Sequence, residues 1–321
     1  MKAVVLAGGF ATRLWPITRH RPKMLLPIGD ATVIDRVFAE LESDDRIDEV
    51  FVSTNAAFAD EFETYLADSE FTKPTLSVEE TTEEDEKFGV VGALAQLVDR
   101  EGIDDDLVVV AGDNLIGFDL AEFVDAFEAN DGPTLAAYDV ETREKATAYG
   151  VIDTEAGQVV DFEEKPDDPP STLVSIACYA FPRESLRFEE YLADGNNPDE
   201  PGWFVQWLVD RDEVYAFPFE AAWFDIGTPE SYLEAVAWAL DGDALVADDA
   251  TVVDSDLGAN VHVMSGARVV DSTLRNTVVF PNATVLDCEI HDSIVDEESR
   301  VEDVDLAGAL LGAHSQLTNG R

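Results

Sequence analysis

The side chains best suited to bind an anion lie at the start of the chain. Residues 1–29 contain five of the 20 lysines and arginines and none of the 69 aspartates and glutamates. The whole chain has a formal net charge of −49, so this segment is a local exception in a strongly acidic protein. Such an exception favours binding of an anionic ligand. The five basic residues are Lys2, Arg13, Arg19, Arg21 and Lys23.

A pair of glycines in this segment follows a predicted strand. The apolar run 3–6 is typical of a buried parallel strand, and Gly8 and Gly9 come where such a strand turns toward a helix. Glycines at that turn let backbone N–H groups approach phosphate oxygens. The pair by itself is equally compatible with an ordinary tight turn. The nearby side chains that can add a hydroxyl and charged donors to a phosphate are Thr12, Arg13 and Lys23.

A candidate metal ligand follows a second apolar run. Residues 107–111 read LVVVA, which predicts a central buried strand, and Gly112 and Asp113 stand at its carboxyl end. In open α/β sheets, ligands bind at that edge. Mg²⁺ binds carboxylate oxygens together with substrate phosphates. We therefore expect Asp113 to hold Mg²⁺, although a Gly-Asp pair also occurs in simple turns.

Apolar periodicity predicts that strands and helices alternate through the first half of the chain. This alternation indicates a Rossmann-like α/β fold, in which helices cover both faces of a mainly parallel sheet. Two further strands should form a hairpin around residues 155–157. The expected helices are 33–41, 57–67 and 91–99, and the expected strands are 49–54, 75–78, 107–111, 149–152, 159–166, 173–181 and 214–218.

The pattern changes from about Ala250 onward. Apolar residues then recur in sets of three, and each set lies 16 residues after the last. A repeat with three inward positions per turn predicts a β-solenoid. The sets are Val269, Leu274 and Val279, then Val285, Ile290 and Val295, then Val301, Leu306 and Leu311, with Leu317 beginning another turn.

The stretch from Leu6 to Gly29, LAGGFATRLWPITRHRPKMLLPIG, carries a family resemblance. It resembles the pattern G-G-x-G-T-R-L-x-P-x-T-x-x-x-P-K-x-x-x-P of the sugar nucleotidylyltransferases, which join a sugar 1-phosphate to a nucleoside triphosphate. Ala11 departs from the pattern, because the family has a third glycine there and glycine permits a positive φ that alanine resists. The matching residues are Gly8, Gly9, Thr12, Arg13, Leu14, Pro16, Thr18, Pro22, Lys23 and Pro27.

The resemblance implies a nucleotide site and a metal site. Arg13 would act on the leaving pyrophosphate and Lys23 on the α-phosphate. Asp113 and Asp225 would hold one Mg²⁺, since residues 223–229 resemble the family element W-x-D-I-G-T-P. In residues 88–94, Gly89 and Gly92 would contact the base, unless they are only small residues at a helix N-terminus. The nucleotide-binding set is Leu6, Ala7, Gly8, Gly9, Thr12, Arg13, Gly89 and Gly92.

A sugar site is implied in the same way by residues 149–151 and 164–166, which resemble the family elements Y-G-V and E-K-P. Gly150 and Glu164 would bind sugar hydroxyls, and Lys165 would bind the sugar phosphate. An exposed Glu-Glu-Lys run is otherwise an ordinary solvated strand edge. Ala177 replaces the usual glycine near this pocket, which is a second departure from the family.

The resemblance extends to the solenoid, which is similar to the left-handed β-helix of many sugar nucleotidylyltransferases. We expect a catalytic domain at 1–240 and a linker with the β-helix at 241–321, the latter serving subunit contact in a homo-oligomer. Some relatives use such a helix for acetyl transfer with a histidine base. Because the helix is short here, we expect its histidines to lie at the surface. They are His262, His291 and His314.

The sequence thus predicts a sugar-1-phosphate nucleotidylyltransferase. It would make a nucleoside-diphosphate sugar and pyrophosphate from dTTP or UTP and a hexose 1-phosphate, most simply glucose 1-phosphate. One alternative is a mannose-1-phosphate guanylyltransferase, which has the same fold and residues. Another is a non-catalytic regulatory subunit that binds nucleotide sugars. Such relatives tend to lose the Lys and Asp positions that are present here.

Composition limits the partners and the compartment. The net charge of −49 argues against nucleic-acid binding, which needs a basic face. The acids are dispersed, as expected of a protein kept soluble in concentrated salt, although an ordinary acidic cytosolic enzyme is the alternative. Because no run reaches 18 apolar residues and no leader pattern opens the chain, we expect a cytoplasmic protein with no membrane partner. Cys178 and Cys288 should be buried and unpaired.

Overall fold

The computed structural model describes residues 1–79 and 88–319. Contacts between residues divide the chain into two compact units. The first comprises Met1–Gly9 and Ile34–Trp223, and the second comprises Phe10–Val33 and Phe224–Arg321. The segment that carries the family pattern therefore begins in the first unit and continues in the second. The boundary that we placed after residue 240 stays a prediction.

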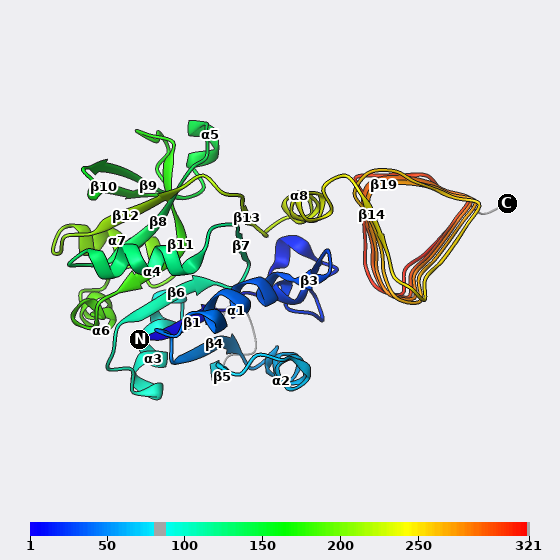
Figure 1. Ribbon diagram of the computed structural model, residues 1–321. Helices are drawn as coiled ribbons and strands as arrows, with labels where there is room; N and C mark the ends of the chain where they lie inside the picture. The colour runs from blue at the N-terminus through cyan, green and yellow to red at the C-terminus, as the bar shows by residue number, and fades with distance from the viewer. Residues whose placement is uncertain (80–87, 320–321) are drawn as a thin grey trace. The chain divides into compact units, whose positions relative to one another are not determined.

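The first unit is built on a nine-stranded sheet (Figure 1). The strands are β1 (Lys2–Leu6), β4 (Glu49–Asn55), β5 (Pro74–Glu79), β6 (Leu107–Ala111), β8 (Thr134–Asp139), β9 (Gly150–Glu155), β10 (Gln158–Glu164), β11 (Leu173–Phe181) and β12 (Tyr215–Phe219). Their order in the sheet is β5-β4-β1-β6-β11-β8-β12-β10-β9. β1 pairs in parallel with both β4 and β6, and β4 pairs in parallel with β5. The β9–β10 hairpin is thus confirmed. The predicted parallel pairing is confirmed for β5, β4, β1 and β6, whereas the sheet as a whole is mixed, because β12 pairs in parallel with β8 and antiparallel with β10.

Strand β11 adds a feature that the sequence did not predict. It runs antiparallel to all three strands with which it pairs, β6, β8 and β9. Its bounds agree residue for residue with the predicted strand 173–181. Most of its residues are buried, so its apolar pattern indicates burial without indicating direction.

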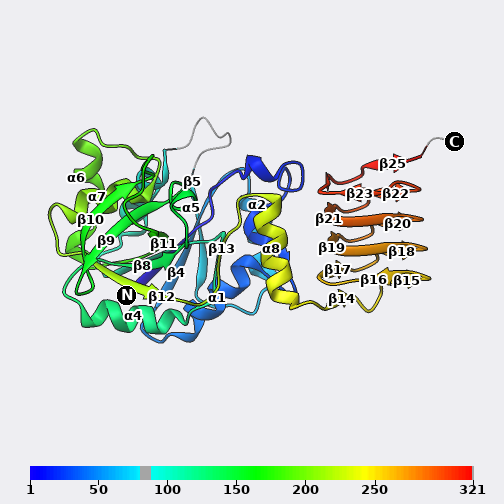
Figure 2. The same ribbon diagram turned by 90° about the horizontal axis from the view of Figure 1, so that it is seen from above.

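Helices cover the sheet on both faces. One face carries α3, α6 and α7, which pack together in an aromatic-rich core that includes Phe188 and Phe204. Helix α4 packs on β8 and β12, and Figure 2 shows it on the side of the sheet opposite α6. The helices are α1 (Val33–Ser43), α2 (Ala59–Asp68), α3 (Val90–Glu101), α4 (Leu120–Ala129), α5 (Arg143–Ala146), α6 (Phe188–Ala193), α7 (Pro201–Val209) and, in the second unit, α8 (Pro229–Leu240). None of the described helices is long and apolar enough to cross a membrane.

The second unit contains residues 10–33, α8 and a parallel β-helix. The coils of the β-helix appear end-on as a triangle in Figure 1 and as stacked layers in Figure 2. Its strands are β14 (Ala244–Val246), β15 (Thr251–Val253), β16 (Asp256–Leu257), β17 (Val261–Val263), β18 (Arg268–Val270), β19 (Thr273–Val279), β20 (Thr284–Leu286), β21 (Glu289–Val295), β22 (Arg300–Glu302), β23 (Leu306–Ala307), β24 (Leu310–Leu311) and β25 (Gln316–Thr318).

Strand pairing confirms the 16-residue repeat. Val269 pairs with Val285, Val285 with Val301 and Val301 with Leu317. The first coil is one residue longer, because Thr251 pairs with Arg268 at an offset of 17. A search at a fixed period of 16 therefore misses this coil, which begins at Ala244 rather than near Ala250.

One corner of the coils is formed by aspartates in the left-handed backbone region, with φ between 50° and 54°. These side chains are exposed. Aspartate and asparagine tolerate this conformation better than most residues. Part of the acidity of the β-helix therefore has a conformational role. The aspartates are Asp254, Asp271, Asp287 and Asp303.

The surface expectation for the histidines is wrong for His262 and correct for His314. His262 is only 7% exposed, because its whole strand β17 is buried. The side chain of His314 is 70% exposed, and the side chain of His291 is intermediate at 39%.

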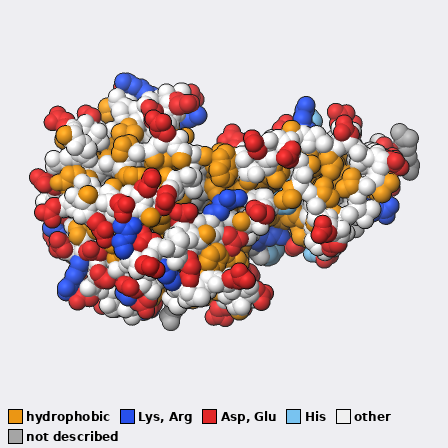
Figure 3. Space-filling view, viewed as in Figure 1, with side chains coloured by type: hydrophobic (Ala, Val, Ile, Leu, Met, Phe, Trp, Pro, Cys, Tyr) orange, Lys and Arg blue, Asp and Glu red, His pale blue; other side chains and the backbone are white. Residues whose placement is uncertain are grey.

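Both cysteines are buried and free, as predicted. Figure 3 shows acidic side chains spread over the whole visible face of the protein.

Candidate active site

The glycine turn at the end of β1 is held by side chains from the neighbouring strand. The Thr54 hydroxyl donates to the carbonyl of Ala7 at 3.2 Å, and the Asn55 amide donates to the carbonyl of Gly8 at 2.8 Å. Thr54 and Asn55 are 0% and 2% exposed. Both side-chain bonds use carbonyl oxygens, so neither occupies a backbone N–H of the turn. Sequence reasoning missed these two residues, although polar side chains at the end of an apolar strand were a visible signal.

Asp113 lies beside the start of this turn. The backbone N–H of Gly112 donates to the carbonyl of Leu6 at 2.9 Å, and Leu6 is in register with Ala111. The structure therefore brings together two predicted groups, the nucleotide turn and the proposed metal ligand, at one edge of the sheet. This proximity follows from the parallel pairing of β1 and β6, whose carboxyl ends coincide.

A short hydrogen-bond chain orients the Asp113 carboxylate. Its Oδ1 accepts from the side-chain amide of Asn114 at 3.0 Å. The Asn114 Oδ1 in turn accepts from the indole N–H of Trp223 at 2.7 Å. Asn114 is 5% exposed, so breaking this chain would leave a buried amide unsatisfied. Neither Asn114 nor Trp223 was predicted as a site residue, although each stands next to a predicted element.

A buried acid also adjoins the turn. Glu79, at the end of β5, is 7% exposed, and burial raises the pKa of its carboxyl group. Its Oε1 accepts from the Ser53 hydroxyl at 3.5 Å and lies 3.9 Å from the position that a β-carbon on Gly8 would take. A raised pKa lowers the negative charge that this carboxyl group would present to an anion.

In the second unit, Ala11 adopts a backbone conformation that favours glycine. Its φ and ψ are 48° and 45°, in the left-handed region. The Ala11 carbonyl accepts from the Thr18 hydroxyl at 2.9 Å and from the backbone N–H of Leu14 at 3.0 Å. These bonds hold a conformation that costs an L-residue about 1–2 kcal/mol. Ala11 therefore holds a backbone conformation that glycine would adopt without this cost.

Arg13 packs on the turn that contains Asp225. The Arg13 Nη2 lies 2.8 Å from the position that a β-carbon on Gly227 would take, so a side chain there would displace the guanidinium group. The turn is fixed by a bond from the Gly227 N–H to the Asp225 carbonyl at 3.0 Å. Thr228 then caps α8 in a reciprocal capping box with Ser231, and Pro229 follows it in the first turn, a pair of residues typical of a helix start. Gly227 belongs to the element W-x-D-I-G-T-P, but the sequence did not predict that it would receive Arg13.

The basic residues at the start of the chain have different environments. Lys2 pairs with Glu49 at 2.6 Å, and Arg21 pairs with Asp296 at 3.0 Å. Arg13 is exposed, and Lys23 is half-buried in the short 3₁₀ helix Lys23–Leu25. Two of the five predicted anion-binding cations are therefore already engaged by carboxylates of the chain itself.

The predicted sugar residues lie together in the first unit. The Glu164 carboxylate lies against two glycines, Gly150 and Gly202. A β-carbon on Gly150 would lie 2.8 Å from the Glu164 Oε2, and a β-carbon on Gly202 would lie 1.7 Å from the same atom. Burial raises the pKa of Glu164 to about 7, the Lys165 charge opposes that rise, and Glu200 adds to it. Lys165 forms an ion pair with Glu200. Gly202, near the start of α7, is needed for this close approach and was not predicted.

The two glycines assigned to the base lie at the start of α3. Gly89 has φ of 76°, and a β-carbon there would lie 2.4 Å from the Pro198 carbonyl oxygen. The N–H of Val91 donates to that same carbonyl at 2.9 Å. Packing alone therefore requires glycine at 89, and contact of Gly89 and Gly92 with a base stays a prediction. The acidic connection before them, residues 80–87, lies outside the described residues.

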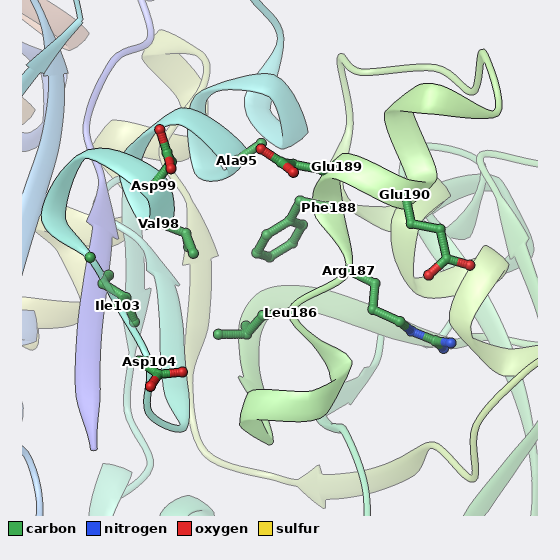
Figure 4. A pocket seen from close by; sticks show the side chains of 11 residues that line it. Ala95, Val98, Asp99, Ile103, Asp104, Leu186, Arg187, Phe188, Glu189 and Glu190 are labelled. Atoms are coloured by element: carbon green, nitrogen blue, oxygen red, sulfur yellow. The ribbon is translucent and has the colours of Figure 1, made fainter.

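A cavity of about 520 Å³ opens between α3 and α6 (Figure 4). Apolar side chains such as Val98, Leu186 and Phe188 form part of its wall. Four carboxylates also line it, and its one cation, Arg187, already pairs with Asp212 at 2.8 Å. This charge does not suit a triphosphate, and none of the predicted site residues is among the residues that line the cavity. The acidic residues are Asp99, Asp104, Glu189 and Glu190.

The fold is that of an α/β nucleotidyltransferase. The chain belongs to the nucleotidyl transferase family, whose profile matches residues 2–242. A mannose-1-phosphate guanylyltransferase of Mycobacterium tuberculosis is 31% identical over 73% of this chain and 63% of its own length. A glucose-1-phosphate thymidylyltransferase of Streptomyces griseus is 27% identical over 99% of this chain and 94% of its own length.

A solved structure agrees with the fold. A protein of Bacillus anthracis, assigned as a glucose-1-phosphate thymidylyltransferase and crystallised with a sucrose, matches with a TM-score of 0.65 at 25% identity. The match covers 76% of this chain and 96% of that protein. For five curated relatives, the aligned region spans 58 to 71% of the relative's own length.

The strained residue in the loop gives a first prediction. Ala11→Gly should raise the free energy of unfolding by about 1 kcal/mol, because glycine adopts a positive φ without the β-carbon penalty. The matched control is Ala126→Gly in α4, which should lower that free energy by about 0.5–1 kcal/mol. Urea unfolding of both variants provides the measurement. A destabilised Ala11→Gly variant would show that the strain is absent.

The environment of Glu164 gives a prediction on pH. Its pKa rises from an ordinary 4.5 to about 7 on folding, so the folded state binds the proton more tightly than the unfolded state. This contribution to stability is present at low pH and is lost as pH rises through that window. Glu164→Gln should therefore stabilise the protein more at pH 8 than at pH 5, as measured by urea unfolding.

The neighbouring residue offers a control for this experiment. Glu163 is exposed on the same strand, and Glu163→Gln makes the same chemical change. Its effect on unfolding should be similar at both pH values. If the two variants showed the same pH dependence, the carboxyl group of Glu164 would not be the buried group described above.

Proposed function

We propose that the protein is a glucose-1-phosphate thymidylyl- or uridylyltransferase. It would convert dTTP or UTP and glucose 1-phosphate into a nucleoside-diphosphate sugar and pyrophosphate. The observation that carries the proposal is the Gly8–Gly9 turn at the end of β1, which has Asp113 at the end of the adjacent strand. The Streptomyces griseus enzyme supports the choice of substrates, because its similarity extends along 99% of this chain.

A guanylyltransferase acting on mannose 1-phosphate is the second candidate. The Mycobacterium tuberculosis relative favours it, at a higher identity of 31% over a shorter part of this chain. The two candidates use the same phosphate chemistry and differ in the base and the sugar. A non-catalytic regulatory role is less well supported, since Lys23, Asp113 and Asp225 are all present.

The proposed reaction is an in-line attack of a sugar-phosphate oxygen on the α-phosphorus of the triphosphate. The new P–O bond forms as the bond to the β-phosphate oxygen breaks, and pyrophosphate leaves. Positioning and charge neutralisation drive such a reaction. Arg13 would bind the departing pyrophosphate and Lys23 the α-phosphate, while Lys165 would hold the incoming sugar phosphate. Glu164 and Gly150 would orient the sugar.

A magnesium ion fits the proposed residues in donor chemistry. Asp113 and Asp225 supply carboxylate oxygens, which this ion prefers, and phosphate oxygens of the substrate would complete its shell. No group of three or more metal-ligating side chains occurs among residues 1–79 and 88–319. When bound, Mg²⁺ neutralises charge on the phosphates.

A pyrophosphate-release assay tests the function. Four nucleoside triphosphates are combined with several sugar 1-phosphates in molar KCl with Mg²⁺, and dTTP or UTP with glucose 1-phosphate should give the highest kcat/KM. Highest activity with GTP and mannose 1-phosphate would favour the second candidate, and no release with any pair would overturn both.

The same assay tests the proposed metal ligand. Asp225→Asn should abolish turnover and keep the fold, because it removes the negative charge of one proposed metal ligand.

We also propose that the surface is adapted to concentrated salt. The support is the net charge of −49 and the spread of exposed acids. Lowering KCl from 1 M to about 0.1 M lengthens electrostatic screening from about 3 Å to about 10 Å, so carboxylates repel one another more strongly. The thermal unfolding midpoint should then fall. A midpoint that holds or rises as salt is removed would contradict the proposal.

Subunit contact through the β-helix stays a prediction.

A further inference from the structure

One corner of the β-helix differs from the exposed aspartate corner. Four residues spaced by 16 occupy it: Met264, Phe280, Asp296 and Gly312. The first three are equivalent, because each backbone N–H donates to a carbonyl of the following coil, on Val279, Val295 and Leu311 respectively. They are 8%, 2% and 2% exposed, and Gly312 is also buried. We call these four residues the buried corner column.

The segment that covers this column is the nucleotide loop, residues 10–33. Arg21 donates from Nη1 to Asp296 at 3.0 Å and forms an ion pair through Nη2 with Glu297 at 3.1 Å. Its guanidinium carbon lies 4.8 Å from the centroid of the Phe280 ring. Pro16 approaches the last member of the column so closely that a β-carbon on Gly312 would lie 2.6 Å from its Cγ. Three successive coils therefore contact the loop.

The Asp296 carboxylate makes this contact specific. Its side chain is 3% exposed, and a buried carboxylate without a cation carries a large desolvation cost. Arg21 satisfies it through a side chain that is itself only 19% exposed. The loop is fixed again six residues later, where the buried Tyr232 of α8 donates its hydroxyl to the Pro27 carbonyl at 2.8 Å. Lys23 lies between these two points.

We infer that the buried corner column positions the nucleotide loop, and that Arg21 and Asp296 are positioning residues for the reaction. The inference rests on the proposed function, in which Arg13 and Lys23 of this loop contact the triphosphate. Arg21 then serves the loop and not the substrate, although it belongs to the same basic segment. The β-helix, which we expected to serve subunit contact, would be required within each chain for phosphate positioning.

Hydrogen exchange tests the positioning directly, whether or not the assay detects turnover. Asp296→Asn should speed amide exchange in peptides from residues 10–26 by about tenfold or more, because the loop loses its buried ion pair. Peptides covering β6 should not change. The matched control is Glu302→Gln, which breaks an exposed pair with Arg300 at 2.8 Å in the same β-helix and should leave the loop unchanged.

A second variant separates loop release from damage to the β-helix. Gly312→Ala adds one methyl group against Pro16 and leaves the ion pair in place, so exchange should rise around residue 16. Arg21→Gln acts from the loop side and should reproduce the effect of Asp296→Asn. Unchanged loop exchange in Asp296→Asn and Arg21→Gln would overturn the inference. So would faster exchange of loop and β-helix peptides together in every variant.

Kinetics then connect position to chemistry. Asp296→Asn should lower kcat/KM for the triphosphate by about tenfold or more, because a small displacement of reacting groups is costly, whereas Glu302→Gln should stay within about twofold. The double variant with Arg21→Ala and Asp296→Ala should lower kcat/KM by less than the product of the fold-losses of the two single variants. A wild-type protein with no activity on any substrate pair would refute the proposed function, and hydrogen exchange would still decide the positioning. Full kcat and KM in Asp296→Asn would overturn the catalytic role of the pair.

Discussion

The parallel pairing of β1 with both β4 and β6 is the constraint on which the site depends. Because β1 is buried and bonded on both edges, the chain leaves all three strands at the same edge of the sheet. Polar groups that follow the strands meet there: the side chains of Thr54 and Asn55 take the carbonyls of the glycine turn, and Asp113 stands beside it. This part of the site is therefore a consequence of strand register.

Beyond Gly9 this support ends, and the chain uses other means to hold its loop. Ala11 accepts a left-handed conformation stabilised by Thr18, and the turn after Asp225 receives the Arg13 guanidinium against a bare glycine. The coils of the β-helix supply a third support, through Asp296. The first support is local, since Thr18 lies seven residues from Ala11, whereas the other two come from partners distant in sequence.

The sequence predicted what depends on local periodicity, and it missed what depends on distant partners. Buried strands such as β6 and the 16-residue repeat follow from apolar spacing, and the start of α8 follows from Thr228-Pro229. The direction of β11 does not, because an almost wholly buried strand has the same composition in either direction. Periodicity likewise cannot indicate what covers an outward residue such as His262. It also cannot indicate the partner of Arg21, because Asp296 lies 275 positions away in the sequence.

The acids of this chain do not form one functional class. Some occupy left-handed corners of the β-helix, where Asp271 and Asp287 meet a conformational need. Asp296 is a buried counterion, and Glu164 is a buried carboxyl group whose pKa is raised to about 7. Groups of these kinds would be needed at any ionic strength, since their role comes from backbone geometry or burial. The proposed adaptation to salt would therefore rest only on the remaining exposed acids, whose removal would change repulsion without changing the fold.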